Sequence, residues 1–313
     1  MLEDKLLEGR VAIVTGSGQG IGREIALCMA KHGAKVITNN RKPGSSLNAF
    51  EKTDLAFDDA EQKALLALSG DAESTAREIL AMGGEAIPVY GDVSDYDNAG
   101  KLVQTALKAW GRVDIIVNNA SSNWTGNIRD MDKELWDRQI HSKLMGSFYL
   151  MHHALPAMEK QGYGRILNSA SDAWVGISSY AAYGAANAAL VALTKASAKD
   201  LAGTGITANA YTPLAMTRSW YNALATYKRR GIPTSVIEAN SPKAMQTTPE
   251  GMVPFLVWLS SEEAGDITGR LFQLAADGEI GLWSESEIVK RIREESGVWT
   301  IEELRKRVKG ELL

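Results

Sequence analysis

Short apolar runs alternate with amphipathic segments along most of the chain. Residues 11–14 read VAIV, a continuous apolar run typical of a strand buried on both faces of a parallel sheet. Ile21, Ile25 and Met29 then recur at four-residue spacing, which predicts an amphipathic helix. The same pattern predicts six further strands, at 35–38, 86–90, 113–117, 165–168, 206–211 and 271–275. It predicts later helices at 71–82, 95–110, 132–160, 183–202 and 249–260.

Strands that alternate with helices are typical of an α/β fold with right-handed crossovers. We therefore predict a Rossmann-type, doubly wound sheet of seven parallel strands in a single domain, residues 1–279. A charged insert at 42–70 interrupts the pattern and has only weak helical periodicity. A C-terminal extension at 280–313 contains the sequence TIEE at 300–303, which predicts a capping box at a helix start. We expect this extension to pack on the domain or on a neighbouring subunit.

Composition excludes several classes of function. With 45% hydrophobic and 23% charged residues and a net charge of −4, the chain has no overall positive charge to attract nucleic acid or an anionic membrane. Cys28 is the single cysteine, so no intramolecular disulfide can form. No apolar run is long enough to span a bilayer and the charged start lacks the apolar core of a secretion signal, so we expect a cytoplasmic protein. His141, His152 and His153 have no acidic or cysteine cluster beside them, so no metal site is predicted.

A glycine-rich turn separates the first strand from the first helix. Residues 15–22 read TGSGQGIG. A backbone that binds a pyrophosphate must approach it closely and adopt dihedral angles that a Cβ opposes, and the next helix points its free N–H groups at the anion. A tight turn without a ligand is the alternative. We predict a dinucleotide site formed by Gly16, Ser17, Gly18, Gln19, Gly20, Ile21 and Gly22.

The end of the second strand bears on the choice between NAD and NADP. An acidic residue there would bind the ribose hydroxyls and repel a 2′-phosphate. The sequence instead places the neutral Asn40 before the cations Arg41 and Lys42. Gln19 adds no second cation from the turn. This pattern favours NADP(H) over NAD(H), with Asn40 and Arg41 as ribose-side contacts, unless the two cations are only solvated surface charges.

Several motifs in a fixed order resemble the short-chain dehydrogenase/reductase superfamily over residues 8–278. They are the glycine turn, Gly-Asp-Val at 91–93, Asn-Asn-Ala at 118–120, and Ser171 followed twelve residues later by Tyr183. The resemblance implies an NAD(P)(H)-dependent oxidoreductase that interconverts a ketone and a secondary alcohol. It also implies further cofactor contacts, at Asp92, Val93, Asn119, Ala120, Tyr183, Asn187, Pro213 and Met216.

The catalytic residues implied by the resemblance include one exchange. Tyr183 would be the acid/base and Ser171 the donor that positions the substrate oxygen. The family's lysine, four residues after the tyrosine, lowers the pKa of the phenol, but here that position is Asn187. Lys143 stands where the family has a relay asparagine. Either Lys143 supplies the missing charge from a neighbouring helix and Asn187 contacts the ribose or the relay, or Lys143 is a solvated helix lysine. In the second case the chain is a catalytically silent, dinucleotide-binding subunit that scaffolds an active paralogue.

Aromatic side chains follow several of the predicted strands and suggest a bulky substrate. They are Trp124, Trp174, Tyr180, Trp220 and Tyr221. Ligands of open α/β sheets bind at the carboxyl ends of the strands, so these residues predict a pocket for a bulky apolar, cyclic or acyl-CoA substrate, unless they simply pack a loop against the domain. The insert and the extension resemble those of short-chain enzymes that act on acyl-CoA or cyclic substrates. Alanine- and methionine-rich faces on helices 132–160 and 183–202 predict a homodimer or homotetramer, with a hetero-oligomer of paralogues as the alternative.

Overall fold

The computed structural model describes residues 5–44, 63, 65, 69–122, 127–129, 131–229, 231–293 and 299–312. Most of the predicted insert at 42–70 lies outside these residues, as does Trp124. The chain divides into two compact units, Met1–Leu282 and Trp283–Leu313.

The first unit is built on one sheet whose strands follow the order β3-β2-β1-β4-β5-β6-β7-β8. Strands β1 to β7 pair in parallel, which confirms the doubly wound arrangement. The predicted number of seven strands is wrong by one, because β8 pairs antiparallel with β7 at the edge. Three residues are too few to show a period of two in the sequence. The strands are β1 Val11–Val14, β2 Lys35–Asn40, β3 Ala86–Tyr90, β4 Ile115–Asn118, β5 Gly164–Ser169, β6 Ile206–Leu214, β7 Leu271–Ala275 and β8 Ile280–Leu282.

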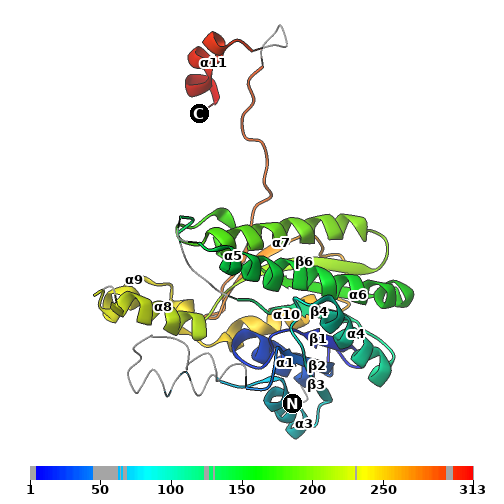
Figure 1. The fold of residues 1–313 in the computed structure, drawn as a ribbon. Helices are drawn as coiled ribbons and strands as arrows, with labels where there is room; N and C mark the ends of the chain where they lie inside the picture. The colour runs from blue at the N-terminus through cyan, green and yellow to red at the C-terminus, as the bar shows by residue number, and fades with distance from the viewer. Residues whose placement is uncertain are drawn as a thin grey trace. The chain divides into compact units, whose positions relative to one another are not determined.

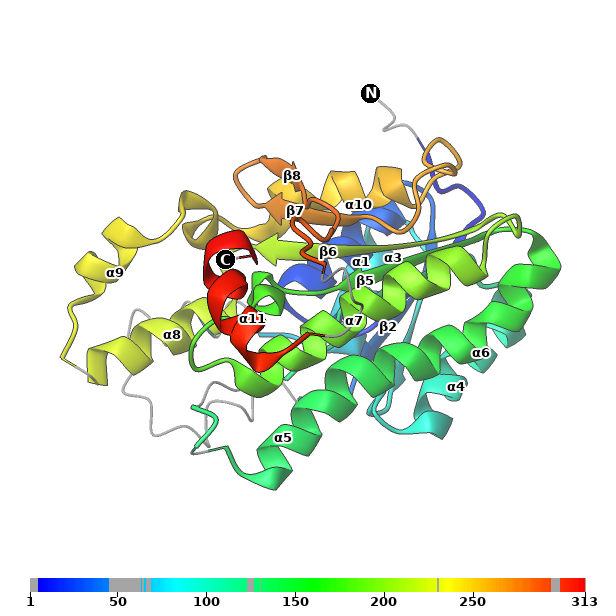
Figure 2. The ribbon, with the colours of Figure 1, turned by 90° about the horizontal axis from the view of Figure 1, so that it is seen from above.

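Helices cover both faces of the sheet (Figures 1 and 2). The first face carries α1 Gly20–Lys31, α3 Ala72–Ala81 and α10 Val253–Leu259, whose apolar sides form one core with the sheet. The opposite face carries α4 Tyr96–Trp110, α6 Gly146–Gln161 and α7 Ala181–Asp200 around a second core. These helices confirm the predicted ones. No helix in the described part of the chain has both the length and the hydropathy needed to cross a membrane.

The predicted helix at 132–160 has a change of geometry near its middle. It consists of α5 Lys133–Ile140, a π-helical turn His141–Met145, and α6. A π-helical turn takes one residue more than an α-helical turn and is frequent at functional sites. Two further helices, α8 Arg218–Arg229 and α9 Thr234–Asn240, follow β6 and were not predicted. Both figures show them beyond the carboxyl end of β6 (Figures 1 and 2).

The second unit contains the capped helix expected at 300–303. Helix α11 spans Ile301–Arg307. Its capping box is confirmed, since the Glu303 backbone N–H donates to Thr300 Oγ1 at 3.3 Å and the Thr300 N–H donates to Glu303 Oε2 at 2.8 Å. The guanidinium of Arg307 lies 4.8 Å from the ring centre of Trp299, which holds the last turn of this helix on the preceding segment.

Candidate active site and dinucleotide turn

The glycine turn after β1 has a backbone that side chains would disrupt. Gly16 and Gly20 have φ angles of +64° and +53°, in the left-handed region that favours glycine. A Cβ on Gly18 would lie 2.1 Å from Asn40 Oδ1 and 2.5 Å from the Cα of Asp71. The turn is therefore in contact with the end of β2 and with the start of α3.

The residues after β4 are hydrogen-bonded to the same turn. Asn119 donates from Nδ2 to the carbonyls of Thr15 at 3.0 Å and Gly16 at 3.3 Å. The hydroxyl of Thr15 in turn accepts hydrogen bonds from the backbone N–H groups of Asn119 and Ala120, both at 3.0 Å. A Cβ on Gly22 would lie 2.4 Å from Asn119 Nδ2, so this glycine is what allows the asparagine to reach the turn. The predicted contacts Asn119 and Ala120 thus lie beside the glycines.

Several polar groups at the turn fit a dinucleotide. Gln19 Oε1 and Asn40 Oδ1 are buried acceptors without a hydrogen-bond partner among the described residues, and ribose hydroxyls are donors that would satisfy them. Ile21 follows in the first turn of α1, where free N–H groups favour a phosphate. The side chain of Ser17 points into the protein instead, because it is 0% exposed and its Oγ accepts from the Asn39 N–H at 2.8 Å. The arrangement provides the acceptors, the glycine backbone and the helix N-terminus that an adenosine diphosphate group requires.

A carboxylate that sequence analysis overlooked lies next to the turn. Asp71 caps α3 and accepts hydrogen bonds from the backbone N–H groups of Ser74 at 3.0 Å and Gly44 at 3.3 Å. Burial acts to raise the pKa of Asp71, but these hydrogen bonds outweigh it and the pKa is lowered. Arg41 and Lys42 are exposed. The ribose side of the turn therefore has two exposed cations and one ionised carboxylate, which the sequence does not place there because 31 positions separate Asp71 from Asn40.

The third strand leads to the predicted residues Asp92 and Val93. Asp92 is half-buried, and its Oδ1 accepts from the backbone N–H of Ser94 at 3.0 Å and from the Ser94 hydroxyl at 2.7 Å. Val93 is buried against Gly146, the first residue of α6. Asn39 also helps to shape this edge, since its Nδ2 donates to the carbonyl of Gly91 at 3.1 Å. These contacts fix the end of β3 beside the end of β2.

Ser171 and Tyr183 both lie at the carboxyl end of β5, as their sequence positions predict. Ser171 precedes the short 3₁₀ turn Asp172–Val175, and Tyr183 lies in the first turn of α7. Burial raises the pKa of the Tyr183 phenol, while the nearby Ser171 hydroxyl acts to lower it. Tyr180 raises it further and has its ring centre 5.9 Å from that of Tyr183. A phenol in this state is a weak acid unless a cation lies close to it.

Asn187, four residues after Tyr183, is fully buried. Its Nδ2 donates to the Tyr183 carbonyl at 2.8 Å, so this nitrogen is bound to its own helix. Its Oδ1 is buried and has no hydrogen-bond partner among the described residues. Asn187 therefore offers an acceptor to the site and brings no charge.

Lys143 is not a solvated lysine, because only 2% of the residue is exposed. It lies in the π-helical turn, which packs against α7, the helix that carries Tyr183 and Asn187. Burial lowers the pKa of Lys143 from 10.5 to about 7, and no carboxylate in the described part of the chain opposes this effect. The turn that packs on the helix bearing the candidate acid thus contains a buried amine.

A buried polar chain that the sequence motifs do not reveal lies beneath these residues. Asn118 on β4 donates from Nδ2 to Asn168 Oδ1 on β5 at 2.8 Å. Asn168 Nδ2 donates to Thr194 Oγ1 on α7 at 2.9 Å. These hydrogen bonds connect β4, β5 and α7, the elements that lie around the site. Asparagines at the ends of apolar strands are the signal that could have identified it.

The loop after the sixth strand begins later than predicted. Strand β6 continues to Leu214, so Pro213 lies in the strand and pairs with Leu274. Met216 follows it and donates from its backbone N–H to the Thr247 carbonyl at 2.8 Å. Among the predicted pocket aromatics, Trp220 is buried in the protein at 6% exposure. Trp174, Tyr180 and Tyr221 are half-buried.

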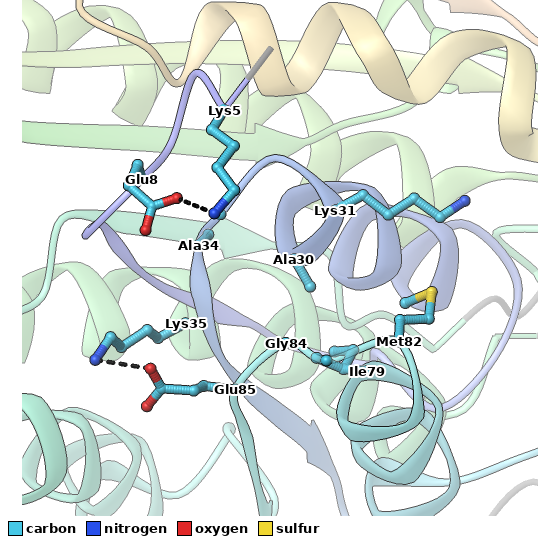
Figure 3. Close-up of a pocket in the computed structure, with 12 residues that line it drawn as sticks. Lys5, Glu8, Ala30, Lys31, Ala34, Lys35, Ile79, Met82, Gly84 and Glu85 are labelled. Carbon is cyan, nitrogen blue, oxygen red and sulfur yellow. Dashed lines mark ion pairs between the residues drawn. The ribbon is translucent and has the colours of Figure 1, made fainter. Parts of the chain in front are cut away.

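A groove of about 420 Å³ lies at the opposite edge of the sheet (Figure 3). It is lined by charged side chains near the amino ends of β2 and β3, and two ion pairs cross its rim, Lys5–Glu8 and Lys35–Glu85, both at 2.9 Å. Ligands of this fold bind at the carboxyl ends of the strands. The groove is therefore separate from the turn and from Tyr183.

Comparison with known proteins identifies the family. The profile of the family described as "short chain dehydrogenase" matches residues 10–67, and that of "Enoyl-(Acyl carrier protein) reductase" matches residues 53–278. The chain belongs to the short-chain dehydrogenase/reductase family. This family comprises NAD(P)-dependent oxidoreductases that interconvert alcohols and ketones, so the predicted enzyme class and cofactor type are confirmed.

Three short-chain dehydrogenases/reductases illustrate the similarity. The chain is 31% identical to a 3-oxoacyl-[acyl-carrier-protein] reductase of Synechocystis sp., covering 86% of this chain and 96% of the relative. It is 27% identical to "(2S)-[(R)-hydroxy(phenyl)methyl]succinyl-CoA dehydrogenase subunit BbsD" of Thauera aromatica, covering 85% and 94%. A crystal structure of a short chain dehydrogenase from Mycobacterium avium matches with a TM-score of 0.76 and 31% identity, over 98% of this chain and 95% of that one.

Proposed function

We propose that this chain interconverts a ketone and a secondary alcohol on an acyl thioester, with NADP(H) favoured over NAD(H). Two relatives are named for acyl thioesters that carry a ketone or an alcohol, a 3-oxoacyl group on a carrier protein and a hydroxylated succinyl-CoA. Neutral Asn40, followed by two exposed cations, supports the phosphorylated cofactor. The nicotinamide, when bound, donates or accepts the hydride.

Tyr183 and Ser171 would act on the substrate oxygen. In the reducing direction Tyr183 donates its phenolic proton to the carbonyl oxygen, and the Ser171 hydroxyl donates a hydrogen bond to the same atom. The turn residues Gly16 to Gly22 would hold the pyrophosphate, with Asp92, Val93, Asn119 and Ala120 along the adenosine half. Pro213 and Met216 would border the nicotinamide.

The buried Lys143 carries this proposal. Tyr183 has a raised pKa, and Asn187 adds no charge to correct it. An ammonium buried without a compensating carboxylate is stabilised by any negative charge that develops nearby, and a phenol that gives up its proton develops such a charge. Lys143 would therefore favour proton donation by Tyr183. The free Asn187 Oδ1 would accept a hydrogen bond from this ammonium, directly or through a water.

The experiment is a measurement of NADPH and NADH oxidation with acetoacetyl-CoA and with a cyclic ketone that has no thioester. The proposal predicts turnover with the thioester and a loss of about 10²–10⁴-fold in kcat for Lys143→Met, the range of general acid–base catalysis. Lys160→Met on the exposed end of α6 is the control and should match the wild type. Unchanged turnover in Lys143→Met would disprove the role of this lysine, and turnover of the cyclic ketone alone would disprove the thioester.

A dinucleotide-holding subunit without its own turnover is the second candidate. It is favoured by Asn187, and by the name of the Thauera aromatica relative, which describes one subunit of a dehydrogenase. This candidate predicts that NADPH binds, as seen by quenching of tryptophan fluorescence, while no ketone is reduced at any pH. Turnover by the isolated chain rules it out.

A further inference from the structure

The start of α8 lies beside the start of α1. Thr217 immediately precedes α8, and its Cγ2 is 3.9 Å from the position that a Cβ on Gly20 would occupy. Gly20 begins α1, whose first N–H groups have no partner within the helix and could donate to a phosphate. The backbone of the next residue, Arg218, therefore lies near the end of the glycine turn at which α1 begins.

Residues 69–71 lie at the other end of the turn. A Cβ on Gly70 would be 2.4 Å from the carbonyl oxygen of Gly18, so the two backbones touch. Arg218 donates from Nη2 to the hydroxyl of Ser69 at 3.4 Å. Since Arg218 starts beside Gly20 and reaches a residue adjacent to Gly70, its side chain extends along the turn that would hold the pyrophosphate.

The turn has little positive charge of its own. Gln19 is neutral, and the first cation on α1, Arg23, is paired with Glu24 and Glu78. Arg218 is half-buried, and burial lowers its pKa, which shows that its charge is partly removed from water. A guanidinium is suited to phosphate because its planar fork forms bidentate hydrogen bonds with the phosphate oxygens.

We infer that Arg218 binds the pyrophosphate of the dinucleotide, closing the glycine turn from the side opposite α1. The inference rests on the proposed dinucleotide site and adds a cation to it from a helix that follows β6. The guanidinium would donate hydrogen bonds to the phosphate oxygens. Adenosine, which has no phosphate, would not benefit from this residue, whereas ADP and both dinucleotides would.

Calorimetric titration with ADP, adenosine and NADPH tests the inference without requiring turnover. In Arg218→Gln the affinity for ADP and NADPH should fall about ten- to hundredfold, as expected for the loss of a hydrogen bond to a charged group. The affinity for adenosine should change by less than about twofold. Arg218→Lys should keep part of the ADP affinity, because a lysine is a cation without the planar fork. Arg77→Gln removes an exposed arginine from α3 and should match the wild type.

Equal ADP affinity in the wild type and Arg218→Gln would overturn the inference. It would also be overturned if both Arg218 variants lost as much affinity for adenosine as for ADP, since the residue would then only shape the loop. A wild type that binds neither NADPH nor NADH would overturn the proposed function instead. The salt dependence of ADP binding is an independent test. The ADP affinity should fall less steeply with salt concentration in Arg218→Gln than in the wild type, because one fewer cation contacts the phosphates.

Discussion

Asn187 donates its side-chain N–H to the backbone carbonyl of Tyr183 at 2.8 Å, within the first turns of α7. The amide nitrogen at the position of the family's lysine is thus bonded to its own helix, and it brings no positive charge to the phenol. A cation for Tyr183 must come from another element. We propose that Lys143, in the π-helical turn that packs against α7, supplies it.

Exchanging the two residues should restore the usual arrangement of the family. Lys143→Asn should lower kcat by about 10²–10⁴-fold, because Tyr183 then has no cation beside it. The double variant Lys143→Asn/Asn187→Lys should regain most of this activity, as measured by NADPH oxidation at saturating ketone. Asn187→Lys alone should be unstable, since it places two ammonium groups in a buried site. A double variant as inactive as Lys143→Asn would show that the two positions do not share a role.

The pH dependence of reduction should report the buried lysine. Burial lowers the pKa of Lys143 to about 7, so its ammonium is present below that pH and is lost above it. The kcat for ketone reduction should therefore fall as the pH rises through about 7. Lys143→Arg should move this decline above pH 10, since arginine stays protonated. An identical pH profile in the two proteins would assign the decline to another group.

The preference for NADPH over NADH should depend on Asn40 and Asp71, which lie at the predicted site of the adenosine ribose. Asn40→Asp adds a carboxylate that repels a 2′-phosphate, so the ratio of kcat/KM for NADPH over NADH should fall at least tenfold. Asp71→Asn removes the carboxylate at the start of α3 and should raise that ratio. Asparagine is also a good N-cap, so α3 should keep its stability. A ratio that is unchanged in both variants would place the 2′-phosphate elsewhere.

The buried chain under the site should contribute to stability. Thr194→Val removes the acceptor of the Asn168 amide, which should lower the free energy of unfolding by about 1–3 kcal/mol in urea denaturation. Thr105→Val is a matched control, because Thr105 also donates to the carbonyl four residues before it, but on the exposed side of α4. A loss of equal size in the two variants would mean that helix propensity, rather than the Asn168 bond, is being measured.

The sequence predicts most of the parallel strands well, because a sheet covered by helices on both faces leaves short apolar runs in the chain. Strands β1, β3 and β7 lie at the residues where these runs predict them, although only β1 of the three is buried along its whole length. β8 and the helices after β6 are missed for different reasons. β8 spans three residues at an edge, and α8 and α9 lie in a polar stretch whose described buried side chains, such as Trp220 and Leu224, are too few to show a helical period.

The site is predictable only where its residues share a local motif. The spacing of Ser171, Tyr183 and Asn187 predicts that they lie together, because all three follow one strand. The burial of Lys143 depends on how a π-helical turn packs on another helix, which no spacing reveals. Arg218 and Ser69 are 149 residues apart and meet through the topology of the sheet, so their contact could only come from the structure.

The π-helical turn His141–Met145 lies between α5 and α6. The number of residues in this turn sets how far α5 is rotated about the helix axis relative to α6. Consecutive α-helical residues are rotated by about 100°. Deleting one residue from the turn, for instance Ser142, would convert it to an ordinary α-helical turn. If α6 keeps its packing in the second core, α5 must then rotate by roughly that angle. Because α5 packs on α7, this rotation would disturb that packing next to the turn that buries Lys143.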